Sequence, residues 1–481
     1  MKIVSSKEDI KNILTENNVA IFGVGGYPST RSEIWPLVSD FEVICGNLSG
    51  EIDSVKIRTK VFVADFESSN KIPEKRPDVV LSDKKVIEHI NSSAKNRKTA
   101  LYFYKPSKKS KEICQKNNWT MLSNSPELFE RFSSKLEFYK ILEELKINRD
   151  IKIFDLADLE KNLDNLFDEW EKIVIQFVDE GGGRGTFFFN KNERAEVMDK
   201  IFARFDLINK KRNNAMKIVA SRFVEGPVLS ITGCITKDNG ILTSYCQYQL
   251  IDIKEATKNK TNAVGVFCGH DWSQSVNIPD EINKQGVELV TKIGEKLKEA
   301  GLKGIFGLDL IWDKKNNQLL PLEINVRLLG TFPASVFVQL DKGEVPIVSF
   351  HILEFLNIPY KIKNEQVFKK DKKRNGGHLL IFNPLGKDVK CGKELKGGVY
   401  KLNNEKIEFL RLGVELIDIK NAGEFILTDG VPTKNLVYAK NGKILKIIAN
   451  EEISEHDGKE LNGWMKNVVK AVYEELGLVS A

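Results

Sequence analysis

The chain has 481 residues, which is more than a single hydrophobic core usually holds, so we expect about three domains. Its 73 Lys and Arg and 67 Asp and Glu leave a net charge of +6, too small at this length to indicate a nucleic-acid partner. The six cysteines form no C-x-x-C pair and no apolar run is long enough to span a bilayer, so we expect a cytoplasmic protein with reduced thiols and no membrane partner.

Residues 1–132 alternate short apolar runs with polar or helical segments, a pattern typical of a parallel α/β layer. The Gly-Val-Gly-Gly segment at residues 23–26 begins like a phosphate-binding turn. However, Pro28 occupies the sixth position of the G-x-G-x-x-G pattern, so we interpret the segment as a tight turn after a strand. The predicted strands of this layer are residues 19–24, 41–45, 60–64, 78–81 and 100–104.

A second unit begins near residue 133. Ser134 and Glu137 have the spacing of a capping box, which predicts a helix with Lys135 in its first turn, where the side chain can reach an anion. Strands are predicted at residues 173–178 and 187–189. The intervening segment is Asp-Glu-Gly-Gly-Gly-Arg-Gly-Thr, which we interpret as a phosphate-binding loop rather than a hairpin tip, because glycine backbones can wrap around phosphate oxygens.

Further strands are predicted at residues 218–223 and 228–235, the second continuing the same sheet, and residues 242–252 carry polar residues at alternate positions. His270 and Asp271 lie in an apolar segment at residues 264–272. Adjacent strand residues point to opposite faces, so the sequence leaves open whether His270 lines a pocket or is structural. A helix is predicted at residues 282–300, ending before a glycine.

The most informative segment is a predicted hairpin, with strands at residues 305–312 and 319–325. Symmetric pairing places Asp309 opposite Glu323, and alternation puts Asn325 on the same face. Two carboxylates and an amide oxygen suit Mg²⁺ together with nucleotide phosphates. The alternative, a surface hairpin with incidental acids, is weakened because the strands are strongly apolar.

Residues 366–481 read as a β-rich domain, which we expect either to cap an active-site cleft or to form a homodimer surface. A two-residue hairpin turn is predicted at Asn441 and Gly442, and a final helix at residues 461–476. The predicted strands are residues 376–382, 407–412, 415–419, 425–428, 436–438 and 444–448.

The order of these parts resembles the ATP-grasp superfamily over residues 133–356. The resemblance is carried by Lys135, the glycine-rich loop, the Phe-Val-Glu-Gly-Pro segment at residues 223–227 and the Glu-Ile-Asn-Val-Arg motif at residues 323–327. It implies a parallel α/β domain at residues 1–132, a two-lobed ATP-grasp domain at 133–365 with its phosphate-lid lobe at about 170–228, and a C-terminal domain similar to that of biotin carboxylase-like members at 366–481.

The resemblance also implies roles for individual residues. Asp309, Glu323 and Asn325 match ligands of Mg²⁺ (or Mn²⁺), and Arg327 and Arg184 match groups that act in catalysis. Two positions differ from the usual pattern, because Gln176 stands where a lysine is common and Val228 where a ribose-binding glutamate is common. The implied nucleotide contacts are Lys135, Gln176, Gly182, Gly183, Gly185, Arg222, Phe223 and Val224.

The implied activity is ATP-dependent ligation of a small-molecule carboxylate to an amine through an acyl phosphate, with release of ADP and phosphate. A carboxylase-like or kinase-type phosphoryl transferase is an alternative. A third hypothesis is an ATP-binding module with reduced catalysis, which the residues Gln176 and Val228 motivate.

Overall fold

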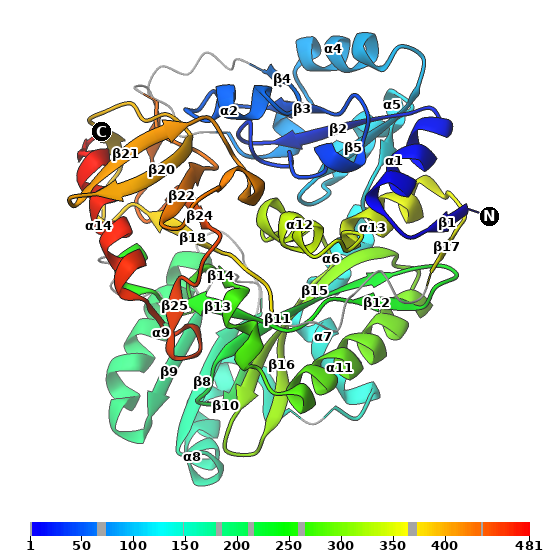
Figure 1. The fold of residues 1–481 in the computed structure, drawn as a ribbon. Helices are drawn as coiled ribbons and strands as arrows, with labels where there is room; N and C mark the ends of the chain where they lie inside the picture. Colours follow the sequence, from blue (N-terminus) through cyan, green and yellow to red (C-terminus); the bar gives the residue numbers. More distant parts are fainter. Residues whose placement is uncertain are drawn as a thin grey trace.

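A computed structural model describes the chain, and its N-terminal part is a parallel sheet covered by helices on both faces (Figure 1). The strand order is β4-β3-β2-β5-β6, as expected for an α/β layer. The strands are β2 (Val19–Gly25), β3 (Glu42–Cys45), β4 (Lys60–Val63), β5 (Lys98–Phe103) and β6 (Thr120–Met121). The described residues are 2–64, 74–147, 149–178, 185–209, 216–257, 265–363, 373–433 and 436–481.

Two details of this layer bear on the predictions. The prediction of a strand at residues 78–81 is wrong, because the segment forms the short helix α3 (Pro77–Val80). Pro77 occupies the first helical turn, where its fixed φ favours a helix, and it lacks the N–H that a strand ladder needs. At Gly23, a Cβ would lie 2.5 Å from the carbonyl oxygen of Arg31, so glycine lets the chain fold back tightly against β2.

A four-stranded antiparallel sheet forms a separate lobe, with strand order β7-β10-β8-β9. The helices α8 (Leu159–Glu169) and α9 (Arg194–Asn209) pack on it around a core of Leu, Ile and Phe side chains. The strands β8 and β9 flank the glycine-rich loop as predicted. The strands are β7 (Ile151–Asp155), β8 (Lys172–Phe177), β9 (Thr186–Asn190) and β10 (Lys217–Arg222).

The largest sheet of the described residues has eleven strands. It contains strands from both sides of the domain boundary predicted at residue 365. Its order is β16-β15-β11-β13-β14-β18-β24-β22-β20-β21, with β12 paired to β11. The first half consists of β11 (Val228–Ile235), β12 (Ile241–Thr243), β13 (Gln247–Ile251), β14 (Phe267–Asp271), β15 (Gly304–Asp313) and β16 (Gln318–Asn325). The second half consists of β18 (Gly377–Phe382), β20 (Gly398–Asn403), β21 (Lys406–Arg411), β22 (Glu424–Thr428) and β24 (Lys443–Ala449).

β11 therefore belongs to the large sheet and does not continue the sheet of β10, contrary to the prediction. The chain changes sheets at Gly226 and Pro227. A Cβ at Gly226 would lie 1.9 Å from the carbonyl oxygen of Trp312, so only glycine permits this close crossing, and Pro227 cannot donate to a ladder. Residues 222–227 thus connect the four-stranded lobe to the large sheet, and we call this segment the hinge because of its position.

Long helices cover the large sheet, and the predicted amphipathic helix is present as α11 (Asp280–Glu299). The helix α7 (Lys135–Glu144) begins after Ser134 as predicted, but the capping box is not formed. Glu137 instead accepts a hydrogen bond of 2.6 Å from Arg131 Nε, so its carboxylate cannot reach back to the cap. The helices α12 (Phe332–Asp341) and α13 (Ile347–Leu356) lie near the centre of the molecule, and the predicted C-terminal helix α14 (Gly463–Leu476) lies at its edge (Figure 1).

Two C-terminal predictions are wrong. Residues 415–419 form a short 3-10 helix (Leu416–Asp418), because the Glu415 and Asp418 side chains cap each other's backbone and compete with a strand. Asn441 and Gly442 do not close a hairpin, because β23 (Val437–Tyr438) pairs with β19 (Val389–Cys391) while β24 pairs with β18 and β22.

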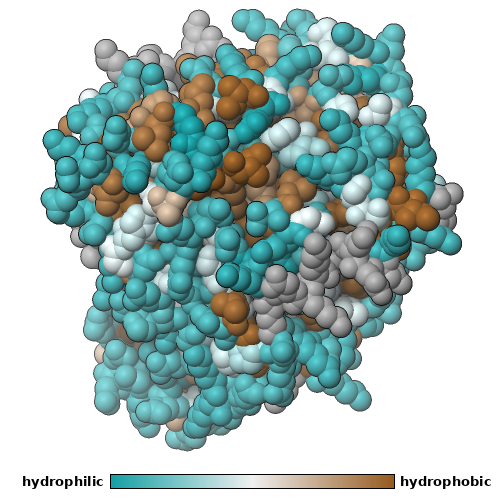
Figure 2. Space-filling model, in the orientation of Figure 1, coloured by the Kyte–Doolittle hydropathy of each residue, from teal (hydrophilic) through white to brown (hydrophobic). Residues whose placement is uncertain are grey.

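Hydrophilic residues cover most of the face shown in Figure 2, and apolar residues gather near its centre. None of the helices in the described ranges is long and apolar enough to cross a membrane.

A buried histidine joins three parts of the fold. His351, on α13, is 2% exposed, and its Nδ1 accepts a hydrogen bond of 3.0 Å from the N–H of Ile305. Its Nε2 lies 2.9 Å from the carbonyl oxygen of Leu122, to which it donates. Both ring nitrogens are therefore used by the neutral tautomer, and burial lowers the pKa of His351 to about 4.

We expect this histidine to make stability fall in acid. Its folded pKa lies below the ordinary value of 6.5, so the unfolded chain takes up the proton first and the contribution to stability is lost as pH falls from 6.5 through 4. The predicted slope is about 1.4 kcal/mol per pH unit for this one group. Urea unfolding of the wild type and of His351→Gln, each at neutral pH and near about pH 5, measures the difference in slope. Parallel pH dependences in the two proteins would contradict the assignment.

Candidate functional site

A cavity of about 850 Å³ lies between the four-stranded lobe and the large sheet, closed at one side by the hinge. The chain supplies its walls from all of its main parts, including the N-terminal layer through Tyr104 and the C-terminal part through residues 457–459. Its polar lining includes Lys135, Arg149, Gln176, Arg222, Gln249, His270, Asp309, Glu323, Asn325 and Arg327.

The hairpin β15–β16 forms an acidic face on the floor of this cavity. The two strands pair in the register expected from the sequence, with Asp309 directly opposite Glu323 and a bulge immediately after Asp309. Asn325 lies on the same face, and its Nδ2 donates a hydrogen bond of 3.1 Å to Asp309 Oδ2. Gln249 Nε2, from the neighbouring part of the sheet, donates to the other oxygen of Asp309. The Asp309 carboxyl group is thus held in place by two amide side chains.

The electrostatics of this face favour a cation. Removal from water and the adjacent charge of Glu323 raise the pKa of Asp309 to about 7, and a bound cation would relieve both effects. Within the described ranges, no group of three or more His, Cys, Asp and Glu is placed to hold a metal. The donor set of Asp309, Glu323 and the Asn325 amide therefore fits a hard ion that takes its remaining oxygen ligands from a bound molecule.

Arg327 is fixed at the edge of the acidic face. Its guanidinium donates to Asn325 Oδ1 at 2.7 Å and to the carbonyl oxygen of Leu328 at 3.2 Å. The Arg327 guanidinium also lies 4.4 Å from the ring centroid of Tyr104. The guanidinium of Arg31 lies 5.4 Å from the same centroid. The N-terminal layer therefore contacts Arg327 through an aromatic ring that also interacts with Arg31.

The predicted hinge and helix residues also line the cavity. Arg222 bonds Asp150 at 2.7 Å and Asp313 at 3.2 Å, so it links the lobe to the large sheet, and Phe223 and Val224 follow it along the wall. Lys135 lines the cavity from the first residue of α7.

The glycine-rich loop is only partly described. Gln176 Nε2 donates to Thr186 Oγ1 at 3.3 Å, and the carbonyl oxygen of Gly185 accepts from the N–H of Phe177 at 2.9 Å, which closes the base of the loop. The predicted phosphate contacts Gly182, Gly183 and Arg184 lie outside the described residues.

Three further lining residues escaped sequence analysis. Arg149 has two guanidinium nitrogens, Nε and Nη1, that are buried and have no hydrogen-bond partner among the described residues. Tyr104 and Gln249 contact Arg327 and Asp309 respectively. The alternating polar residues of 242–252 were a usable signal for Gln249, but no local pattern marks Arg149 or Tyr104.

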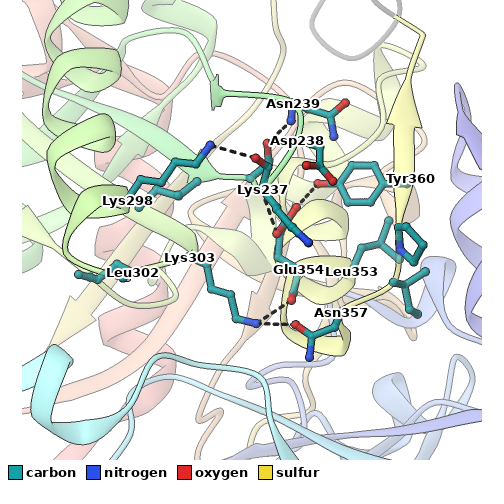
Figure 3. A pocket seen from close by; sticks show the side chains of 15 residues that line it. Lys237, Asp238, Asn239, Lys298, Leu302, Lys303, Leu353, Glu354, Asn357 and Tyr360 are labelled. Carbon is teal, nitrogen blue, oxygen red and sulfur yellow. Dashed lines mark hydrogen bonds between the residues drawn. The ribbon is translucent and has the colours of Figure 1, made fainter. Parts of the chain in front are cut away.

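A second cavity, of about 300 Å³, lies beside α13 at the other end of β11 and is shown in Figure 3. Several of its charged side chains are engaged within the fold. Lys303 Nζ donates to the carbonyl oxygen of Glu354 and to Asn357, and Glu354 accepts from the Tyr360 hydroxyl and the N–H of Lys237. We therefore locate the chemistry in the larger cavity.

Comparison with known families identifies the central part of the chain. A sequence profile described as the ATP-grasp domain matches residues 132–331. Residues 132–331 are an ATP-grasp domain. No curated protein matches the chain.

Solved structures extend the likeness of the ATP-grasp domain to the whole chain. Biotin carboxylase from Campylobacter jejuni, solved as a β,γ-ATP complex, has a TM-score of 0.56 at 13% identity, over 91% of this chain and 89% of that one. Phosphoribosylamine–glycine ligase from Thermotoga maritima has a TM-score of 0.53 at 14% identity, over 96% and 97%. L-amino acid ligase from Bacillus licheniformis has a TM-score of 0.54 at 13% identity, over 97% and 99%. At these identities the likeness establishes a shared fold.

Proposed function

We propose that the protein is an ATP-dependent ligase that joins a small carboxylic acid to an amine, with Mg²⁺ or Mn²⁺ as the ion. The main support for this proposal is the acidic face of Asp309, Glu323 and Asn325 on the floor of the large cavity. The walls of the same cavity supply cationic side chains, including Lys135 and Arg149. That arrangement suits a metal-bound triphosphate. The matched ATP-grasp domain and the similar ligase structures support the same chemistry.

The proposed reaction has two steps. A carboxylate oxygen of the acid attacks the γ-phosphorus of ATP, and the bond from this phosphorus to the β,γ-bridging oxygen breaks, giving an acyl phosphate and ADP. The amine nitrogen then attacks the acyl carbon, the bond from carbon to the phosphate oxygen breaks, and the nitrogen loses a proton. The bound ion supplies charge neutralisation for the phosphates.

The residues of this chain would align the reactants. Asp309 and Glu323 hold the ion, and the hinge residues Arg222 to Val224 lie where a base would be held at the cavity wall. Arg327, fixed by its neighbours, would orient the acid or the acyl phosphate. Exclusion of water by the lobe would protect an intermediate that hydrolyses readily.

The proposal is tested by incubating the protein with Mg²⁺, ATP and pairs drawn from amino acids, dipeptides and simple amines. We expect release of ADP and phosphate only when both an acid and an amine are present, with a new amide detected by mass spectrometry. A stable phosphate ester would indicate a kinase-type transferase. ATP binding without turnover on any pair would indicate the reduced binding module that Gln176 and Val228 motivate.

Arg149 provides a separate prediction about the nucleotide. Its unpartnered guanidinium nitrogens face a cavity proposed to hold a triphosphate, so Arg149→Met should raise the Kd for ATP by about tenfold. Adenosine, which has no phosphate, should bind the variant and the wild type equally. Isothermal titration calorimetry measures both.

The matched control is Arg194→Met, because Arg194 is an arginine of the same lobe that pairs with Asp164 outside the cavity. An unchanged Kd for ATP in Arg149→Met would remove Arg149 from the phosphate site.

A further inference from the structure

A continuous row of polar side chains crosses one face of the large sheet, from the acidic face to the C-terminal part of the chain. Asp309 pairs with Ser230 across β15 and β11, and Ser230 pairs with Gln247 across β11 and β13. Gln249, two residues along β13 and so on the same face, pairs with His270 of β14. His270 in turn lies directly opposite His378 of β18. The row therefore begins at the proposed ion site and ends at two histidines.

Hydrogen bonds within the row connect Trp272 to the ring of His270 and are satisfied by one tautomer of it. The indole N–H of Trp272 can only donate, and it donates to Gln247 Oε1 at 2.6 Å. This orients the amide so that Gln247 Nε2 donates to Ser230 Oγ at 3.1 Å. Ser230 Oγ lies 2.9 Å from His270 Nε2, and a hydroxyl that already accepts from Gln247 can donate its proton to this nitrogen. When Ser230 donates in this way, His270 carries its own proton on Nδ1.

Ring nitrogens of both histidines have no hydrogen-bond partner among the described residues. His270 Nδ1 is buried without a partner among the described residues, and both ring nitrogens of His378 are buried in the same condition. His270 is 3% exposed and His378 fully buried, and their ring centroids are 5.4 Å apart. Burial and the nearby Lys446 ammonium lower the pKa of each, to about 3 for His270, so both rings are neutral donors.

Lysines beyond the histidines add positive charge. His378 pairs with Ile448 of β24, and Lys446, two residues away on that strand, therefore lies on the same face of the sheet as His378. Lys446 is 2% exposed. Asp429 accepts from Lys443 at 2.7 Å and from Lys446 at 3.3 Å, so two ammonium groups share one carboxylate. Glu51 is a buried carboxyl group near Asp429, and it accepts hydrogen bonds from the backbone N–H groups of the two residues that follow Asp429. Burial raises the pKa of Glu51. Buried donors and excess positive charge call for an oxyanion.

The distance from the ion site limits the size of the substrate molecule that contains this oxyanion. Ser230 is a cross-strand neighbour of Asp309 and bonds the His270 ring, which places the ring roughly 10 Å from the Asp309 carboxyl. A transferred phosphoryl group followed by an amino acid or a short dicarboxylate spans this gap. Of the three side chains His270, His378 and Lys446, His270 is the one that lines the large cavity, so a carboxylate would reach the row there.

We propose that His270, His378 and Lys446 bind a carboxylate of the substrate that takes no part in the reaction. The ligase, whose activity is itself the proposal made above and on which this inference rests, would therefore select substrates with a carboxylate besides the reacting group. Amino acids and dicarboxylic acids are the matching class, and simple amines and monoacids are not.

The test uses the full chain labelled with ¹⁵N-histidine, whose five histidines give a spectrum that can be assigned by substitution. Long-range ¹H–¹⁵N correlation should show His270 protonated on Nδ1. In the presence of Mg²⁺ and a non-hydrolysable ATP analogue, L-alanine or succinate should then shift the ring nitrogens of His270 and His378 saturably. L-alaninamide and succinamide, which lack a carboxylate, should not.

His351 is the internal control, since both of its nitrogens are bonded within the fold and its signals should stay still. Lys446→Met should weaken L-alanine or succinate binding by about tenfold. If that variant does not fold, His378→Gln replaces it, with the same expectation. No saturable shift from either carboxylate, or equal shifts from the amides, would overturn the inference.

Binding of the ATP analogue, followed in the same samples, separates the two proposals. If the protein binds the analogue but neither carboxylate shifts the ring-nitrogen signals of His270 and His378, the carboxylate subsite is refuted and the proposed function is not. Failure to bind the analogue would refute the proposed function.

Discussion

Glu323→Gln is expected to abolish ATP turnover, by at least about a thousandfold, while the protein remains folded. Glutamine preserves the volume of the side chain but cannot supply the negative charge that the ion requires. Glu323 is exposed on the cavity floor, so its replacement leaves no cavity in the core. Phosphate release under saturating ATP, together with a thermal unfolding curve, measures both parts of the prediction.

The matched control is Glu288→Gln, an exposed glutamate on the neighbouring helix α11 outside the cavity. It should retain wild-type turnover. Near wild-type turnover in Glu323→Gln would show that the acidic face does not hold the ion, and the residue assignments that depend on it would be wrong.

Arg327→Lys should lower kcat by about a hundredfold while leaving the Kd for ATP within about twofold of the wild-type value. The guanidinium is held at once by Asn325, a backbone carbonyl and the Tyr104 ring, and a lysine ammonium cannot reproduce this planar arrangement. The effect is confined to kcat because the proposed contact is to the acid or acyl phosphate and not to the nucleotide. Steady-state kinetics and calorimetry with ATP separate the two quantities.

Arg97→Lys, in the N-terminal layer and outside the cavity, serves as the control for the same change of side chain. A loss of ATP affinity as large as the loss of kcat would place Arg327 on the nucleotide phosphates instead of the acid.

The hairpin was predictable because its information is local. Alternating apolar residues define both strands, and a short polar connection leaves essentially one register, which the structure has, with Asp309 opposite Glu323. The strands on either side of the glycine-rich loop were predictable for the same reason. Errors arose where one residue outweighed the pattern, as Pro77 did by starting a helix.

The rest of the candidate site depends on contacts between distant segments. The polar row follows from the strand order β15-β11-β13-β14-β18, and no local pattern indicates that His270 and His378 become cross-strand partners. Sequence alternation correctly separated His270 from Asp271. Asp271 faces away from the cavity and accepts bonds from the backbone of Ile453 and Ser454. Arg149 likewise reaches the cavity only through the packing of the lobe against α7.

The central claim is that the acidic face holds an ion together with a triphosphate, and binding of Mn²⁺ followed by electron paramagnetic resonance tests it most directly. The described residues supply two carboxylates and one amide, too few ligands for tight binding by the protein alone. We therefore predict tight Mn²⁺ binding by the wild type only when ATP is present, and its loss in Glu323→Gln. Mn²⁺ binding that is equally tight without ATP, or that survives unchanged in Glu323→Gln, would contradict the account.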